Sequence, residues 1–330
     1  MIDWHRLHFG DTEDVRRFLA NHELSLETAG DRAYLERVRD EAIEYLRRNF
    51  SFAIPKPLER ASVDQLLLMA AGKAESNHRQ LCACTILKTV HIIHHMSGRE
   101  LLFRLPVSDH DLFHLVEEKV YRMVGTMLSA GFPITEFIGG RKNLDSTYTK
   151  LLSKQEATAS ALYDKLRFRI VTRTREDVLP ILSYLTQRVL PFNYVVPQQS
   201  TNTLLNFRDF CMEHPHLRDM VPQFQGDMED MLSPGDNRFS APSYRVIHFV
   251  ADIPVRVPEH VMELAPTGCE GLGPIVFMLC EFQLLDADSD AANETGDASH
   301  EAYKQRQKAA VFARLRMGVR PEKPPTDSES

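Results

Sequence analysis

The chain of 330 residues lacks a long apolar segment. No apolar run approaches the roughly 18 residues that a membrane-spanning helix requires, so the sequence predicts no membrane partner. The N-terminal segment MIDWHRLHFGDTEDVRR contains acidic side chains and no apolar core of the kind that a signal peptide carries. Both absences favour a cytoplasmic protein.

Cysteine is scarce, and positive charge does not dominate. The five cysteines are odd in number and lie in or beside apolar stretches, which favours a reduced, cytoplasmic setting over a disulfide framework. The net charge of −7 argues against nonspecific binding to duplex DNA, because DNA phosphates attract basic surfaces. The length suffices for one large domain or two moderate ones with real cores.

Several common site signatures are also missing. The single pair Gly139-Gly140 is not a glycine-rich phosphate loop, and the chain has no internal repeat. His91 and His95 are one helical turn apart, but no acidic or cysteine partner lies nearby at a convincing spacing, so a metal site there is disfavoured. The sequence therefore excludes the simplest nucleotide and metal motifs.

Residues 1–135 are predicted to form a mostly α-helical module. Amphipathic stretches include EDVRRFLANHEL, AYLERVRDEAIEYLRRNF and DLFHLVEEKVYRMVGTMLSA. Asp11 or Thr12 is suited to cap the first of them, and a further helix is predicted to begin at Ser62.

Strand-type segments follow Gly131-Phe-Pro. They are KLRFRIVT (165–172), FNYVVP (192–197), YRVIHFVADIPVRV (244–257) and PIVFMLCEFQLLD (274–286). With a helix predicted over 176–189, the pattern indicates an α+β fold in which helices flank a mixed β-sheet. The expected organisation is a sheet domain (136–285) with an inserted loop or lid (200–242), an acidic linker (286–299), a C-terminal helix (300–317) and a disordered tail (318–330).

The window from Arg141 to Arg175 is basic although the whole chain is acidic. It contains nine Lys or Arg against three Asp or Glu. Lys142, Ser146 and Lys150 follow one another at four-residue spacing in a helix-like stretch, which places them on one face. Cations and a hydroxyl on one helix face are suited to bind phosphate groups.

A carboxylate and an arginine follow in the next strand-like segment. Asp164 begins the segment and Arg169 lies within it, on the face opposite the apolar side chains. One interpretation is a magnesium ligand beside a phosphate-binding arginine. The alternative is an edge strand with a solvated basic face and Asp164 in a turn.

Glu281 lies in the apolar run IVFMLCEFQLL and shares a strand face with Gln283. Burying an ionised carboxylate without a partner costs several kcal/mol or more, roughly, so a divalent cation is one compensating partner. The alternative is a strand that reaches solvent at Glu281.

Tyr244 and His248 share a face of another predicted strand, where they suit either nucleotide contacts or an ordinary amphipathic sheet.

Taken in order, these residues resemble the synthetase domain of RelA/SpoT-type alarmone synthetases. Members of that family use Mg²⁺ to move the β,γ-pyrophosphate of ATP onto the 3′-hydroxyl of GDP or GTP. The matching residues are Lys142, Ser146 and Lys150, then Asp164 and Arg169, then Tyr244 and His248, and last Glu281 and Gln283. His300, Tyr303 and Lys304 look similar to a trailing helix motif in many members.

The resemblance covers roughly residues 136–310 and implies a nucleotidyltransferase-like sheet domain, with a role for each matched residue. Asp164 and Glu281 are expected to hold Mg²⁺, and Glu281 also to polarise the attacking hydroxyl, supported by Gln283. Tyr244 is expected to stack on the acceptor base, and His248 to contact the acceptor's phosphate or ribose. The phosphates of ATP are expected to be bound by Arg141, Lys142, Ser146, Lys150 and Arg169.

Four positions depart from the family pattern. Gly140 stands where the first arginine of the opening motif is expected, although the adjacent Arg141 is placed to reach the same region. Arg167 and Ser243 replace glycines, and Leu285 replaces the arginine that usually follows Glu-x-Gln. These departures leave the identity of the acceptor open.

The resemblance therefore predicts a Mg²⁺-dependent pyrophosphokinase that acts on a guanine nucleotide and makes (p)ppGpp, the alarmone of the stringent response. One alternative keeps this chemistry but uses the 3′ end of tRNA as acceptor. A second alternative is a catalytically degenerate nucleotide-binding regulator, and a third is an interaction module carried by the helical half. Formation of a homo-oligomer is left open.

Overall fold

The computed structural model describes residues 9–141, 143–153, 166–196, 199–213 and 241–316, with the backbone alone at 109, 144, 150, 207, 208 and 211. The chain divides into two compact units. The first unit consists of Met1–Phe132, Pro180–Val195 and Ala251–Leu279, and the second of Pro133–Leu179, Val196–Val250 and Cys280–Ser330. The predicted contiguous domains thus differ from the observed units, because Tyr194, Ile275 and Phe277 are buried in the core of the helical unit.

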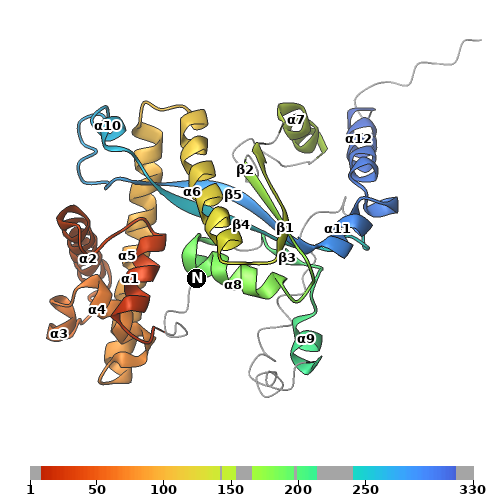
Figure 1. The fold of residues 1–330 in the computed structure, drawn as a ribbon. Coiled ribbons are helices and arrows are strands. Elements are labelled where there is room, and N and C mark those ends of the chain that lie inside the picture. The colour runs from red at the N-terminus through yellow and green to blue at the C-terminus, as the bar shows by residue number, and fades with distance from the viewer. Residues whose placement is uncertain (1–8, 142, 154–165, 197–198, 214–240, 317–330) are drawn as a thin grey trace, which may run out of the picture. The chain divides into compact units, whose positions relative to one another are not determined.

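The first unit is mostly helical, as the amphipathic patterns predict (Figure 1). Its elements are α1 (Thr12–Asn21), α2 (Ala29–Phe50), α3 (Lys56–Glu59), α4 (Val63–Leu68), the π-helix η2 (Met69–Lys73), α5 (Asn77–Arg104), α6 (Asp109–Ser129), the 3₁₀ turn η4 (Phe192–Tyr194) and α10 (Glu259–Met262). Asp11 caps α1 by accepting hydrogen bonds from the backbone of Glu13 and Asp14. Ser62 and Gln65 form a capping box at α4.

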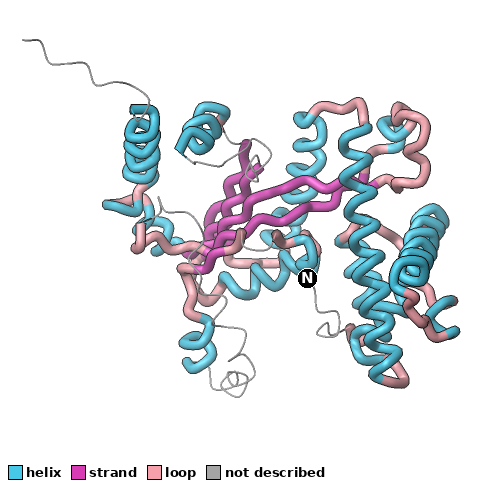
Figure 2. Tube along the Cα trace, turned by 180° about the vertical axis from the view of Figure 1, so that it is seen from behind, coloured by secondary structure: helices cyan, strands magenta, loops and turns pink. Residues whose placement is uncertain are grey.

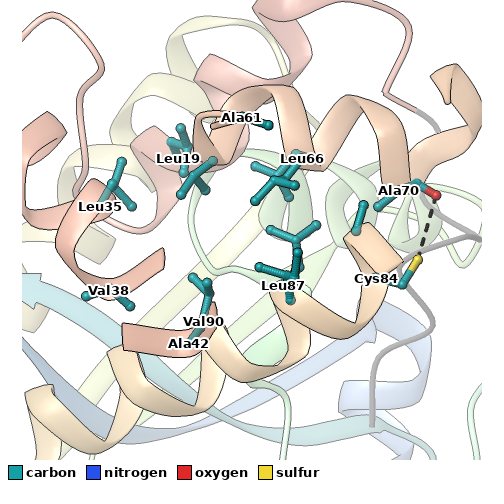
Figure 3. Close-up of a cluster of buried hydrophobic side chains, with 14 of the residues drawn as sticks. Leu19, Leu35, Val38, Ala42, Ala61, Leu66, Ala70, Cys84, Leu87 and Val90 are labelled. Carbon is teal, nitrogen blue, oxygen red and sulfur yellow. Dashed lines mark hydrogen bonds between the residues drawn. The ribbon is translucent and has the colours of Figure 1, made fainter. Parts of the chain in front are cut away.

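The core of the first unit lies between α2, α4 and α5. Figure 3 shows Leu35 and Val38 from α2, Leu66 from α4, and Leu87 and Val90 from α5 among the buried side chains that gather there. The thiol of Cys84 lies 4.0 Å from the carbonyl oxygen of Ala70 in the same cluster. A packed interior of this kind leaves little room for added atoms.

Two helical glycines in this unit offer a matched test of that packing. A Cβ on Gly98 in α5 would lie 2.7 Å from the carbonyl oxygen of Ile275 and 2.5 Å from the ring of Phe277. We expect Gly98→Ala to lower the free energy of unfolding by about 1–3 kcal/mol through overpacking. Gly125→Ala in α6, where a Cβ would meet nothing within 4 Å, should instead raise it by about 0.5–1 kcal/mol. Urea denaturation of both variants checks this, and equal effects would contradict it.

The second unit contains the edge of a mixed sheet and the helices beside it. Its elements are β1 (Ile134–Arg141), α7 (Leu144–Ser153), β2 (Leu166–Thr172), β3 (Thr201–Asn202), α9 (Phe207–Glu213), α11 (Ala287–Asn293), the 3₁₀ turn η7 (Gly296–Ala298) and α12 (His300–Arg316). Three elements, α8 (Val178–Arg188), β4 (Ile247–Arg256) and β5 (Ile275–Asp286), have residues in both units. The strand order is β1-β2-β5-β4-β3, drawn in magenta in Figure 2. Because β1 pairs with β2 antiparallel and β2 with β5 parallel, the predicted α+β class with a mixed sheet is confirmed.

One face of the sheet is apolar in the second unit. Phe137, Phe168, Phe282 and Phe249 come from β1, β2, β5 and β4, and their rings form a continuous row. Neighbouring ring centroids are 6.1 Å apart for Phe137–Phe168, 5.5 Å for Phe168–Phe282 and 5.2 Å for Phe249–Phe282. Since side chains alternate along a strand, the residues between these phenylalanines lie on the opposite face.

Three predicted segments have a different structure. FNYVVP was expected as a strand, but after Pro191 the chain makes the 3₁₀ turn η4 and buries Asn193 and Tyr194, with one isolated bridge from Val195 to Ala251. The strand predicted from Tyr244 begins at Ile247, since a turn precedes it. The predicted acidic linker contains α11, because the side chain of Asp286 caps this helix at the backbone of Ser289.

Two other regions also differ. Strand β1 was not predicted, although ITEFI is rich in β-branched and aromatic residues, because the glycine pair that follows is unfavourable in a strand. The predicted loop at 200–242 contains β3 and α9 in its first part, and residues 214–240 lie outside the described residues. The predicted tail at 318–330 also lies outside them. In the part of the chain that the structure describes, no helix is long and apolar enough to cross a membrane.

Candidate functional site

The polar face of the sheet brings together side chains from β2 and β5. Pairing between these strands aligns Arg167 with Glu281 and Arg169 with Gln283. Because directly paired residues point to the same side, the two arginines lie on the face of Glu281, opposite the phenylalanine row. Two of the predicted site residues on β5 are thereby placed beside two cations on β2.

Glu281 is the buried centre of this face. The residue is 7% exposed. Its Oε1 accepts a hydrogen bond of 2.7 Å from Nε2 of Gln283 and lies 3.3 Å from Nε2 of His248 on β4. The alternative of a strand end that reaches solvent is therefore wrong, and the carboxylate is stabilised by an amide and an imidazole. Three of the predicted site residues thus meet.

His248 and Tyr244 lie beside Glu281 on the polar face and have further neighbours there. Nδ1 of His248 lies 3.5 Å from the hydroxyl of Thr201, its partner on β3. Tyr244 precedes β4, and burial raises the pKa of its phenol. Glu281 raises that pKa further, while the positive charge of Arg169 opposes the rise, so the phenol lies within electrostatic range of both. The tyrosine is therefore neutral at ordinary pH and can donate a hydrogen bond.

Arg169, predicted to bind phosphate, is held by two carboxylates of the second unit. Its guanidinium pairs with Asp290 of α11 and lies 3.7 Å from the carboxylate of Glu294. Helix α11 is fixed in turn by Asn293, which bonds both the backbone NH and the carbonyl of Arg245. The sequence analysis did not predict this ion pair, because it interpreted the acidic segment that contains Asp290 and Glu294 as a linker.

Three of the predicted phosphate ligands belong to the segment of helix α7, and two of them are not fully described. Helix α7 begins after Asn143, whose side chain accepts a hydrogen bond from the backbone of Asp145. Lys142 falls outside the described residues. Ser146 is half-buried on α7 and lies one turn before Lys150, whose backbone alone is described. Their roles stay predictions.

Three other positions of the predicted motifs, Asp164, Arg141 and Leu285, can now be compared with the structure. Asp164 lies outside the described residues, so its partnership with Glu281 stays a prediction. Arg141 pairs with Leu166, which places it on the face opposite Gly140, so the register does not direct it to the same region. Leu285, the departure from the expected arginine, is completely buried, and an apolar side chain fits there.

The donor chemistry of Glu281 suits Mg²⁺, the ion that the family resemblance implies. Mg²⁺ is usually bound through one or two carboxylates together with substrate phosphates. Across the described residues, no group of three or more His, Cys, Asp or Glu side chains could hold a metal ion by itself. Glu281 therefore fits as one ligand of an ion that takes its other ligands from a bound polyphosphate.

Similarity to known proteins is found among solved structures alone. No family model matches the chain, and no curated protein matches it. Among solved structures, small alarmone synthetase 1 from Bacillus subtilis, bound to its product pppGpp, is 14% identical over 69% of this chain and 90% of its own, with a TM-score of 0.31. This chain resembles alarmone synthetases.

Two further structures belong to the same group. Small alarmone synthetase 2 from Bacillus subtilis is 14% identical over 64% of this chain and 96% of its own, with a TM-score of 0.30. A GTP pyrophosphokinase family protein from Streptococcus pneumoniae is 12% identical over 63% and 89%, also with a TM-score of 0.30. Likeness at this level carries no activity over to this chain, so the function is argued from its residues.

The first unit contains a separate cluster of histidines. Asn193 Nδ2 lies 3.1 Å from both His22 Nε2 and His91 Nδ1, and His95 Nε2 lies 2.7 Å from the carboxylate of Asp252. Burial lowers the pKa of His22 to about 3 and that of His91 to about 4. His22 and His91 are therefore neutral rings that share the amide of Asn193, and His95 has an acidic neighbour that its own sequence segment does not contain.

Proposed function

We propose that this chain is a Mg²⁺-dependent pyrophosphokinase that transfers the β,γ-pyrophosphate of ATP to the 3′-hydroxyl of GDP or GTP. The observation that carries the proposal is the buried carboxylate of Glu281, which Gln283 and His248 orient beside the cations of β2. A buried, oriented carboxylate next to arginines provides the two requirements of phosphoryl-type transfer, namely a base for the attacking hydroxyl and positive charge for the phosphates.

Each residue on the polar face would have a separate role in the reaction between ATP and the acceptor. Glu281 would accept the proton of the attacking 3′-hydroxyl while that oxygen bonds to the β-phosphorus of ATP. The bond from the β-phosphorus to the oxygen of the α-phosphate breaks, and AMP leaves with the electron pair. Gln283 holds Glu281 in place, and His248 and Tyr244 border the side on which the acceptor would bind. Mg²⁺, held by Glu281, would neutralise charge on the phosphates.

Label transfer tests this proposal directly. Purified chain incubated with γ-³²P-labelled ATP, Mg²⁺ and GDP or GTP is expected to form a labelled guanosine product and equimolar AMP. The same incubation with tRNA instead of the nucleotide tests the alternative acceptor. Product formation should disappear when EDTA removes Mg²⁺ and return when Mg²⁺ is restored. Consumption of no ATP with any of the three acceptors would contradict the proposed activity.

A second candidate, a nucleotide-binding regulator without activity, is favoured by one observation. Arg169, which the motif assigns to phosphate, is paired with Asp290 and Glu294. A chain that binds the ATP analogue AMPCPP but transfers no label to any acceptor would be such a regulator. Calorimetric titration beside the transfer assay therefore separates the two candidates.

A further inference from the structure

The two arginines on the polar face of β2 have different surroundings. Arg169 is 20% exposed in its side chain and pairs with the carboxylates of α11. Arg167 is exposed, and its side chain makes no ion pair and no hydrogen bond with the described part of the chain. The charge of a guanidinium with two carboxylate partners is already balanced, so it attracts a phosphate less strongly than an unpaired guanidinium does.

Arg167 also lies in a row that leaves space beside it. Gly140 on β1 pairs with Arg167, and Arg167 pairs with Glu281, so the three residues line up across adjacent strands. A Cβ added to Gly140 would meet nothing within 4 Å. Because Gly140 has no side chain, there is open space on one side of the guanidinium of Arg167. The carboxylate of Glu281 lies on the other side.

Electrostatic effects place the charge of Arg167 among the other polar side chains of the site. Burial raises the pKa of Tyr244, and Arg167 opposes that rise. Burial also lowers the pKa of His300 at the start of α12, and the charges of Lys304 and Arg167 lower it further. The guanidinium thus lies within electrostatic range of a phenol and an imidazole that border the same face.

We infer that Arg167, with the space above Gly140, forms the binding site for the phosphate chain of the nucleotide donor, and that Arg169 instead anchors α11. This inference rests on the proposed function, because it assigns the donor's polyphosphate to one row of the same face. It reverses the sequence-based role of Arg169. A planar guanidinium binds phosphate oxygens in a bidentate way, which an amide cannot reproduce.

Calorimetric binding of AMPCPP and of AMP, both with Mg²⁺, tests the assignment. Arg167→Gln is expected to weaken AMPCPP binding about 10–100-fold and AMP binding by less than about 2-fold, because only AMPCPP carries the phosphate chain. Arg167→Lys should recover part of the loss, since it keeps the charge. Arg169→Gln should change AMPCPP binding by less than about 3-fold, and Arg122→Gln on the exposed surface of α6 serves as the matched control.

Filling the space at Gly140 gives an independent measurement. Gly140→Val adds a side chain that favours strand structure, so the variant should fold while AMPCPP binding weakens several-fold. If wild type binds AMPCPP but Arg167→Gln binds it within about 2-fold as well, the inference is overturned and the proposed function stands. If wild type binds no AMPCPP with Mg²⁺, both fail together. A loss in Arg169→Gln that equals the loss in Arg167→Gln also overturns the inference.

Discussion

Glu281→Gln is expected to reduce transfer of labelled pyrophosphate about 10²–10⁴-fold, the usual contribution of a positioned general base. Glutamine keeps the size and the polarity of the side chain but can neither accept the proton of the hydroxyl nor offer a charged oxygen to Mg²⁺. The carboxylate is buried, accepts a hydrogen bond from Gln283 and lies 3.3 Å from Nε2 of His248, so it is held in one position. The rate of label transfer at saturating ATP and acceptor is the measurement.

The matched control for this variant is Glu136→Gln. Glu136 lies on β1 of the same unit and is exposed, so its replacement removes the same charge without touching the site. Its transfer rate should stay within about 2-fold of wild type. A Glu281→Gln enzyme that retains more than about a tenth of the wild-type rate would exclude Glu281 as the base. Binding of AMPCPP by the inactive variant would show that the fold is intact.

Mild acid is expected to destabilise the first unit. Burial lowers the pKa of His22 to about 3 and that of His94 well below its ordinary value. In the unfolded chain both rings bind a proton near pH 6.5, whereas in the folded chain they stay neutral. Stability is therefore complete above about pH 6.5 and is lost as the pH falls toward the folded-state pKa. Protonation linked to His22 should remove about 2 kcal/mol between about pH 7 and pH 5, and His94 acts in the same direction.

The structural basis of this effect is the set of hydrogen bonds that require neutral rings. His22 donates from Nδ1 to the carbonyl oxygen of Phe18 at 2.8 Å, so its Nε2 accepts from the amide of Asn193 at 3.1 Å. His94 lies 2.7 Å from the hydroxyl of Tyr34 through Nδ1. A proton on Nε2 of His22 would place two donors face to face, and the charge would be buried among aromatic rings.

Urea denaturation at about pH 7, 6 and 5 measures the slope. His22→Gln should be less stable than wild type at neutral pH, yet its stability should depend less on pH by about 1 kcal/mol per pH unit. His110→Gln is the control, because the side chain of His110 is 64% exposed and its removal should leave the slope unchanged. Identical slopes in all three proteins would show that the buried histidines do not cause the acid sensitivity.

Local features of the fold could be predicted because they depend on neighbours in the chain. Asp11 and Ser62 begin helices where their side chains can satisfy free backbone NH groups, and both starts were expected from the sequence. Alternation along LRFRIVT predicts one apolar and one basic face, and β2 has them. The apolar surroundings of Glu281 likewise predict its burial, since they are adjacent in the chain.

Features that depend on strand neighbours could not be predicted in this way. Only the order β1-β2-β5-β4-β3 places Glu281 between Arg167 and His248. Register also decides faces, because a shift of one residue moves every side chain to the other side. Arg141 was expected to replace the missing arginine at Gly140, but the pairing places it on the face of Leu166.

The sequence by itself determined the α+β class, the order of most elements, and a carboxylate with an amide two residues later on a buried strand. Capping, alternation and burial are short-range effects, so one chain suffices to show them. The tertiary structure decided which cation stands beside that carboxylate. It paired Arg169 with Asp290 and left Arg167 facing the space at Gly140. That choice depends on long-range packing of α11 and on strand register, which no local pattern specifies.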